Sequence, residues 1–425
     1  MGHITNPQKE YQLLQKKLDS FATGAPDSPV FQKILEIIYS PEEASIARKL
    51  PGIPAPLSKL AKKLDIDKDE LDDKLTKMAK RGALLDMEIK GEKHFFLPPV
   101  VIGFFEYTFM RAREDVPLKE LAELFHTYMY ETDSFARSVF QKTTQIGRTL
   151  VNEESLPEET VTEILDWERA VHIVESASSV SVSDCACRHK MQHLDKACDA
   201  PMAVCLTLNN AAEILVRNGH AKKITNEEGL KILDDCKKLG LVQTGDNVQN
   251  DISYICNCCS CCCGMLQAIN THNINNAIVS SNWIMDVLTN CKGCGVCISK
   301  CPVDAIEFYT DEDNRKLARC VTEKCIGCGV CISSCKFGAM EMVPRQKRVF
   351  TPYDVIDKTI AMAIERGKLT ELVFDDPEKI SHKTISRLMS ALEKSPPYKA
   401  LIAIEPLRSH FLNKLVNYAI KNTDI

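Results

Sequence analysis

The sequence predicts an α+β protein built from several domains. Its 425 residues are 44% hydrophobic and 26% charged, which suits two to four globular domains with their own cores. The first third has no cysteine and reads mostly as helix, the middle combines short strands with clustered cysteines, and a later segment repeats itself. We place a helical domain at 1–115, a cysteine-rich α/β domain at 116–283, the repeated domain at 284–345 and a helical extension at 346–425.

The amino terminus and the composition indicate the cellular setting. The first residues lack the basic start, apolar stretch and cleavage site of a signal peptide, and no run approaches about 18 apolar residues. We therefore expect a cytoplasmic protein without membrane insertion. In a reducing compartment, the 20 cysteines suit metal binding better than disulfides. A net charge of −5 gives no general reason to expect nucleic acid as a partner.

Within the first domain, residues 56–99 predict a helix, a turn, a second helix and a β-hairpin around Lys90–Gly91. This order is that of a winged helix. A winged helix meets DNA with the first turns of its second helix, and here these turns carry five carboxylates that would repel phosphate. We therefore expect a protein-docking or packing role and no specific DNA binding. The five carboxylates are Asp67, Asp69, Glu70, Asp72 and Asp73.

The middle domain opens with helices predicted over 117–130 and 157–176. A short strand at 180–182 then leads into four cysteines, Cys185, Cys187, Cys198 and Cys205. A further helix over 225–240 begins with a capping box of Thr225 and Glu228. Its apolar face includes Cys236, which we interpret as a core thiol.

The densest cysteine segment, residues 256–263, follows another short strand predicted at 251–255. Adjacent cysteines rarely reach the separation and direction that a disulfide requires. Metal–sulfur ligation by at least some of these thiols is therefore the better interpretation. The six cysteines of this segment are Cys256, Cys258, Cys259, Cys261, Cys262 and Cys263.

The strongest chemical signal is an internal repeat. Residues 291–306 read CKGCGVCISKCPVDAI and residues 325–340 read CIGCGVCISSCKFGAM, so every cysteine recurs 34 positions later. Each half has the spacing C-x2-C-x2-C-x3-C, in which three thiolates bind one 4Fe-4S cluster and the fourth binds its neighbour. This rule assigns Cys291, Cys294, Cys297 and Cys335 to a first cluster, and Cys325, Cys328, Cys331 and Cys301 to a second. Glycines at 293, 295, 327 and 329 would let the loops turn their amides toward the cluster sulfurs.

This repeat resembles the bacterial dicluster ferredoxins over roughly 55 residues, which implies two 4Fe-4S clusters. Cys301 is followed by Pro302, as that family expects, whereas Cys335 is followed by Lys336. The lysine alters the local turn and adds a positive charge near the first cluster. A zinc ribbon is the alternative, but zinc needs four ligands and has no use for eight cysteines in this pattern.

We interpret the ten cysteines of the two middle segments as ligands of one or two additional iron–sulfur clusters. Their spacing leaves open whether two clusters divide them or some thiols remain free. Zinc is an alternative for the segment from Cys185 to Cys205, because His189 and His193 lie nearby. Arg188 could donate hydrogen bonds to a cluster or offset its negative charge.

The order of these segments over residues 30–345 resembles a family of iron–sulfur proteins common in anaerobic bacteria and archaea. The resemblance implies electron transfer in anaerobic metabolism, between redox protein partners of which a flavoprotein oxidoreductase is one candidate. The chain has no glycine-rich phosphate loop, so a partner would have to supply any flavin or nicotinamide. Two alternatives stay open, a redox- or iron-responsive regulator acting through the winged helix, and a reductase whose site lies in residues 185–263.

The last segment, residues 351–425, has no chemical residues in a pattern. An amphipathic helix is predicted to begin near Pro352, and residues 401–405 predict a short strand. This extension could pack on the cluster domains or dock a partner.

Overall fold

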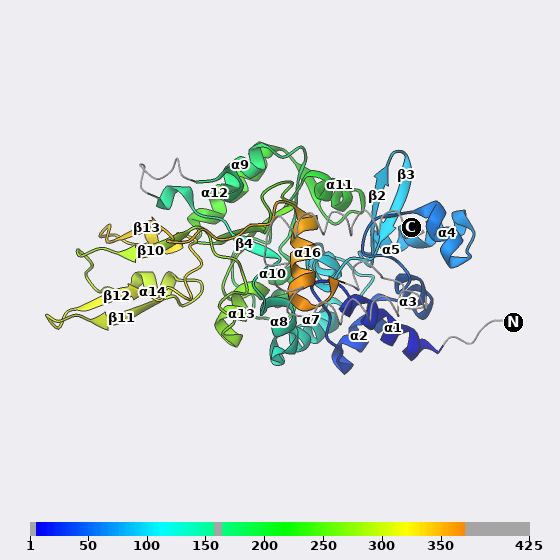
Figure 1. The fold of residues 1–425 in the computed structure, drawn as a ribbon, viewed down its shortest axis with the longest axis horizontal. Coiled ribbons are helices and arrows are strands. Elements are labelled where there is room, and N and C mark those ends of the chain that lie inside the picture. The colour runs from blue at the N-terminus through cyan, green and yellow to red at the C-terminus, as the bar shows by residue number, and fades with distance from the viewer. Residues whose placement is uncertain (1–5, 157–163, 370–425) are drawn as a thin grey trace, which may run out of the picture. The chain divides into compact units, whose positions relative to one another are not determined.

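The computed structural model describes residues 6–156 and 164–369, with mixed helix and sheet (Figure 1). The described chain forms two compact units. The first contains residues 6–108, 114–128 and 359–369, and the second contains 109–113 and 129–358 without the gap at 157–163. Within these described residues, no helix is both long and apolar enough to cross a membrane.

The first unit begins with three helices that each start at a proline, α1 (Pro7–Asp19), α2 (Pro29–Ile38) and α3 (Pro41–Ala47). Proline suits this position because the first helical N–H has no intrahelical partner. Helix α7 (Leu118–His126) follows later, near the predicted range of 117–130. Aromatic rings fill the core, and those of Phe31 and Tyr128 stack with their centroids 4.7 Å apart.

The predicted helix–turn–helix–hairpin order is present in the first unit. Helix α4 (Leu57–Leu64) and helix α5 (Lys68–Lys80) precede strands β2 (Leu85–Ile89) and β3 (Glu92–Phe96), and β3 also pairs with β1 (Ala55–Pro56). The turn residues Lys90 and Gly91 both have positive φ, as a two-residue hairpin turn requires. The identification of this unit as a winged helix stays a prediction.

The acidic start of α5 has a structural role. The Asp67 carboxylate caps the helix by accepting hydrogen bonds from the amides of Asp69 and Glu70. Carboxylates in a first helical turn are stabilised by the helix dipole. The neighbouring basic side chains are also engaged, because Lys74 pairs with Glu42 and Glu70, Lys77 with Asp73, and Lys93 with Asp72.

We expect that the full chain does not bind DNA specifically, because these lysines are already paired and the leading turns of α5 are acidic. An electrophoretic shift assay with genomic fragments at physiological salt should show only weak retention that disappears as salt rises. Tight, sequence-dependent retention would contradict this expectation. It would favour the alternative that the protein is a redox- or iron-responsive regulator acting through the winged helix.

The second unit is organised around a six-stranded antiparallel sheet with strand order β4-β8-β9-β6-β5-β7. Helices α9 (Ala170–Glu175) and α12 (Asn226–Lys238) pack together, and α12 contacts β5, β6 and β8. The strands are β4 (Gly147–Thr149), β5 (Val180–Asp184), β6 (Ala203–Leu208), β7 (Lys222–Ile224), β8 (Val242–Asp246) and β9 (Tyr254–Cys258). The other helices of this unit include α8 (Asp133–Phe140), α10 (Ala186–Gln192), α11 (Asn209–Arg217) and α13 (Gly264–His272).

Several predicted elements of this unit agree with the structure. Helix α12 opens with the predicted capping box, in which Thr225 and Glu228 each bond the other's backbone N–H. Cys236 is buried at 1% exposure, as expected for a core thiol.

Two predicted elements differ in position or continuity from the elements in the structure. The strand predicted at 251–255 lies at β9, three residues later, so it carries Cys256 and Cys258. The predicted helix over 157–176 is not continuous, because Asp166–Glu168 form a 3-10 turn before α9 begins at Ala170. Its predicted start at Pro157 lies outside the described residues.

A buried ion pair explains the break before α9. The Arg148 guanidinium on β4 lies 2.9 Å from the Glu168 carboxylate, and both side chains are at most 1% exposed. Asn282 also donates to Glu168, at 2.7 Å. The 3-10 turn therefore brings the Glu168 carboxylate into contact with the buried Arg148 guanidinium.

The repeated segment forms two small antiparallel sheets in the second unit. Strand β10 (Trp283–Val287) pairs with β13 (Met340–Pro344), and β11 (Ile306–Thr310) pairs with β12 (Lys316–Cys320). Short helices α14 (Val296–Lys300) and α15 (Val330–Ser333) follow the two cysteine loops. Helix α16 (Val355–Arg366) comes next, close to the predicted start, whereas the strand predicted at 401–405 lies outside the described residues.

Candidate metal centres

The eight cysteines of the repeat surround two cavities. The first cavity is lined by Cys291, Cys294, Cys297 and Cys335, and the second is lined by Cys301, Cys325, Cys328 and Cys331. Each cavity thus takes three cysteines from one half of the repeat and one from the other, which is the crossed arrangement that the spacing predicted.

The cysteine loops have the backbone conformation that the glycines predicted. Gly293, Gly295, Gly327 and Gly329 all have φ between 63° and 77°. A Cβ at Gly327 would collide with the backbone carbonyl of Trp283 and with the Ser281 hydroxyl. The glycines therefore allow a close approach that would be blocked by any other residue.

Backbone amides point at sulfurs in both cavities. The amide of Ala305 donates to Cys301 Sγ at 3.2 Å, and the amide of Ala339 donates to Cys335 Sγ at 3.4 Å. These are equivalent positions of the repeat. Such bonds stabilise thiolate sulfur and tune the potential of a cluster. The donor set, the amides and the glycine loops therefore fit 4Fe-4S clusters.

Cys320 is a thiol that the spacing did not assign to either site. It ends β12, opposite Ile306, and its side chain hydrogen-bonds that of Cys325. This contact lowers the pKa of Cys325 to about 6, against the opposing effect of burial. Cys320 does not line either cavity, so we regard it as a neighbour of the second site.

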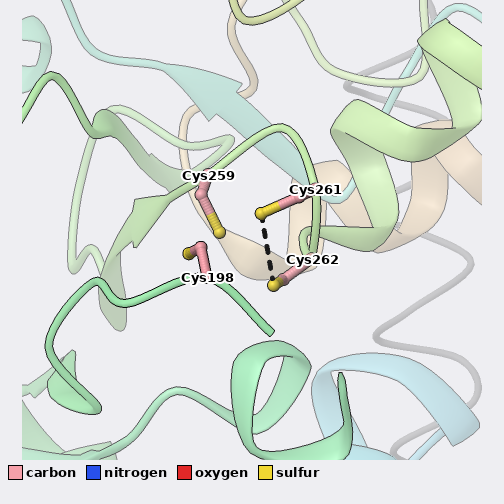
Figure 2. A group of neighbouring side chains, drawn as sticks. All are labelled: Cys198, Cys259, Cys261 and Cys262. Atoms are coloured by element: carbon pink, nitrogen blue, oxygen red, sulfur yellow. Dashed lines mark hydrogen bonds between the residues drawn. The ribbon is translucent and has the colours of Figure 1, made fainter. Parts of the chain in front are cut away.

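Four thiols of the middle domain form a compact group, which we call the sulfur quartet. The Sγ atoms of Cys198, Cys259, Cys261 and Cys262 all lie within 4.8 Å of one another (Figure 2). Cys259, Cys261 and Cys262 belong to the turn between β9 and α13, and Cys198 comes from the loop between α10 and β6. The turn is closed by the Cys263 amide, which donates to the Cys259 carbonyl at 3.1 Å.

Arg188 lies against the sulfur quartet and is fully buried. Its guanidinium donates to Cys259 Sγ at 3.5 Å and also to the Asn257 carbonyl. Hydrogen bonds from Cys262 and Arg188 lower the pKa of Cys259 to about 4. A lowered pKa favours the thiolate, the form that binds metal.

The other six predicted ligands lie apart from the sulfur quartet. We call Cys185, Cys187, Cys205, Cys256, Cys258 and Cys263 the six-thiol group. Five of them form a sulfur series in which each thiol shifts the pKa of the next, in the order Cys185, Cys205, Cys256, Cys258 and Cys263. The ten cysteines thus divide into four and six.

The two histidines near the first cysteine segment, His189 and His193, contact groups other than the thiols of the sulfur quartet. The Nδ1 atom of His189 lies 2.7 Å from the Phe109 carbonyl, and its Nε2 atom lies 3.2 Å from His193 Nε2. Neither histidine is part of the sulfur quartet. No pattern in the sequence singles out Lys190, which lies on α10 with His189 and is fully buried beside the thiols.

One small cavity is lined by residues of both the repeated segment and the central sheet. Cys328 of the second cavity and Leu241 both line it. Leu241 in turn belongs to an apolar cluster with Cys185 and Cys205, against which Cys256 and Cys259 pack. Leu241 therefore faces Cys328 across this small cavity and packs with thiols of both groups of the middle domain.

Comparison with known families identifies part of the chain. The family model described as a 4Fe-4S dicluster domain matches residues 290–339, which include all eight cysteines of the repeat. Neither the comparison with curated proteins nor the comparison with solved structures found a match.

Proposed function

We propose that this protein transfers electrons between redox proteins of anaerobic metabolism, through the two ferredoxin-type clusters and at least one more cluster. Cys291, Cys294, Cys297 and Cys335 would hold the first cluster, and Cys301, Cys325, Cys328 and Cys331 the second. The sulfur quartet would hold the third. When bound, such clusters supply one-electron transfer.

The observation that carries this proposal is the position of Leu241, which lines a small cavity together with Cys328 and belongs to the apolar cluster against which Cys259 packs. An electron-transfer chain needs its centres to be close to one another, and Leu241 lies next to thiols of both regions. The same thiols of the sulfur quartet would suit zinc, but zinc has no redox chemistry and would add no step to an electron-transfer chain.

Of the proposed cluster sites, the one at the first cavity is the site that a redox partner can reach from solvent. Cys294 is exposed, whereas Cys328 and Cys331 are buried. Around it, Val296 is 41% exposed and Phe337 49%, and Lys292 and Lys336 are exposed as well. An apolar patch flanked by lysines suits a redox partner with an acidic rim, a flavoprotein among the candidates.

The quartet is tested by replacing Cys259 with alanine in the full chain, after anaerobic reconstitution with iron and sulfide. We expect the variant to lose about four iron and four sulfide ions per chain, because Cys259 is the quartet thiolate bonded by Arg188. Iron, sulfide and zinc are measured together with the EPR spectrum of the reduced protein.

Cys236→Ala is the matched control. It removes a more deeply buried thiol, from the apolar cluster against which Cys259 packs, and should keep the full iron content. Zinc in place of iron in the wild-type protein, or an unchanged iron content in Cys259→Ala, would contradict a cluster at the quartet.

A further inference from the structure

The six-thiol group lies where three strands of the central sheet and two helix starts meet. Strand β9 pairs with β6 in a register that continues to place Cys205 opposite Cys256. Cys258 lies two residues further along β9 and therefore projects from the same face. Cys185 and Cys263 are the residues that begin α10 and α13.

This arrangement accounts for the density of cysteines in residues 256–263. Alternation along β9 gives Cys256 and Cys258 to the six-thiol group. The tight turn that follows sends Cys259, Cys261 and Cys262 to the sulfur quartet, and Cys263 returns to the six-thiol group. One segment thus supplies thiols to two separate sites.

Two cations lie between these sites. The Lys190 Nζ atom is buried without a hydrogen-bond partner, 4.0 Å from the centre of the Tyr130 ring. The thiols that act on its charge are Cys187 of the six-thiol group and Cys262 of the quartet. Arg188 donates to Cys259 Sγ of the quartet at 3.5 Å, and Cys185 of the six-thiol group acts on its charge as well.

The charge balance of this region calls for anions. Among the described residues, no carboxylate lies within ion-pair distance of Lys190 or Arg188. A buried cation without a counter-ion is strongly unfavourable. An iron–sulfur cluster with four thiolate ligands is a buried anion, and two such anions would neutralise both cations and repel each other less across them.

We propose that the six-thiol group binds an iron–sulfur cluster of its own, separate from the one at the sulfur quartet, with Lys190 as a positioning cation between the two. Its ligands are Cys205, Cys256 and Cys258, the centre of the sulfur series, together with Cys185 or Cys263 at one end. The inference builds on the proposed function by adding a fourth centre to the electron-transfer chain.

The ligand assignment is tested by Cys205→Ala and Cys258→Ala in the full chain after anaerobic reconstitution. We expect each variant to lose about four iron and four sulfide ions relative to wild type, with an unchanged far-UV circular dichroism spectrum. If one variant fails to fold, the other decides. Cys236→Ala again serves as the control for loss of a buried thiol.

The iron contents of these variants distinguish a cluster at the six-thiol group from the proposed cluster at the sulfur quartet. Wild-type iron and sulfide in folded Cys205→Ala and Cys258→Ala proteins would overturn the inference. Loss of iron in these variants combined with full iron in Cys259→Ala would support the inference and overturn the quartet. A double variant, Cys205→Ala with Cys259→Ala, should lose twice the iron of either single variant.

The role of Lys190 is tested by potentiometric titration followed by EPR. In Lys190→Met, we expect the midpoint potentials of the middle-domain clusters to become more negative, because a nearby positive charge favours the reduced form. Lys190→Arg should restore them. Lys196→Met removes an exposed lysine nearby and should have a much smaller effect. Unchanged potentials in Lys190→Met would overturn this role.

Discussion

Replacing Cys294 by alanine is expected to abolish one ferredoxin-type cluster and leave the other intact. Cys294 lines only the first cavity, so the variant should lose about four iron ions and the EPR signal of one cube. Cys328 is its equivalent in the repeat and lines the second cavity. Cys328→Ala should therefore lose the same amount of iron but retain the complementary signal.

Cys320→Ala is the control for the paired variants Cys294→Ala and Cys328→Ala. The Cys320 thiol hydrogen-bonds Cys325 but does not line the second cavity. Cys320→Ala should therefore keep the iron of both clusters, with at most a shifted spectrum for the second. Loss of iron from Cys320→Ala, or two intact signals in Cys294→Ala, would show that the ligands are assigned wrongly.

Replacing Glu168 by alanine is expected to lower the free energy of unfolding of the second unit by about 3–5 kcal/mol. The substitution leaves the fully buried Arg148 without its carboxylate, and burial already lowers the pKa of this arginine. Urea unfolding followed by tryptophan fluorescence is a direct readout, because the two tryptophans of the chain, Trp167 and Trp283, flank this ion pair and its partner Asn282.

The control for this prediction is Glu153→Ala. Glu153 pairs with Arg169 at 3.1 Å, but both side chains are partly exposed. We expect a loss of about 0–1 kcal/mol, since water replaces much of such an interaction. Equal unfolding midpoints for Glu168→Ala and Glu153→Ala would mean that the buried pair contributes no more than a surface pair.

The cysteine spacing of the repeat was sufficient to predict which thiols share a cavity. Three thiols of each set lie in one short loop, so local geometry dictates their grouping, and the other half of the repeat supplies the crossed fourth thiol. The positive φ values of Gly327 and its equivalents follow from the same local chemistry. Local signals also predicted helix α12, whose capping box lies within its own first turn.

The division of the other ten cysteines could not be predicted from spacing. It depends on where β9 begins and on its register with β6, and both are set by pairing between strands far apart in the sequence. A strand at 251–255 would have left every cysteine of 256–263 in the following loop. Lys190 could not be singled out either, because burial of a lysine depends on the elements packed over it.

The crossed fourth ligands also affect how the protein can be made. Cys335, which completes the first cavity, comes after Cys325, Cys328 and Cys331 in the chain, while Cys301 of the second cavity precedes them. The second cavity therefore has all its thiols only when synthesis has reached Cys331, and the first only when it has reached Cys335. A ribosome-bound chain that stops between Ser281 and Gly327 also lacks the hydrogen bond joining these residues. A chain that ends before Cys325 therefore lacks thiols of both cavities, whereas one that ends between Cys331 and Cys335 lacks only the last thiol of the first cavity.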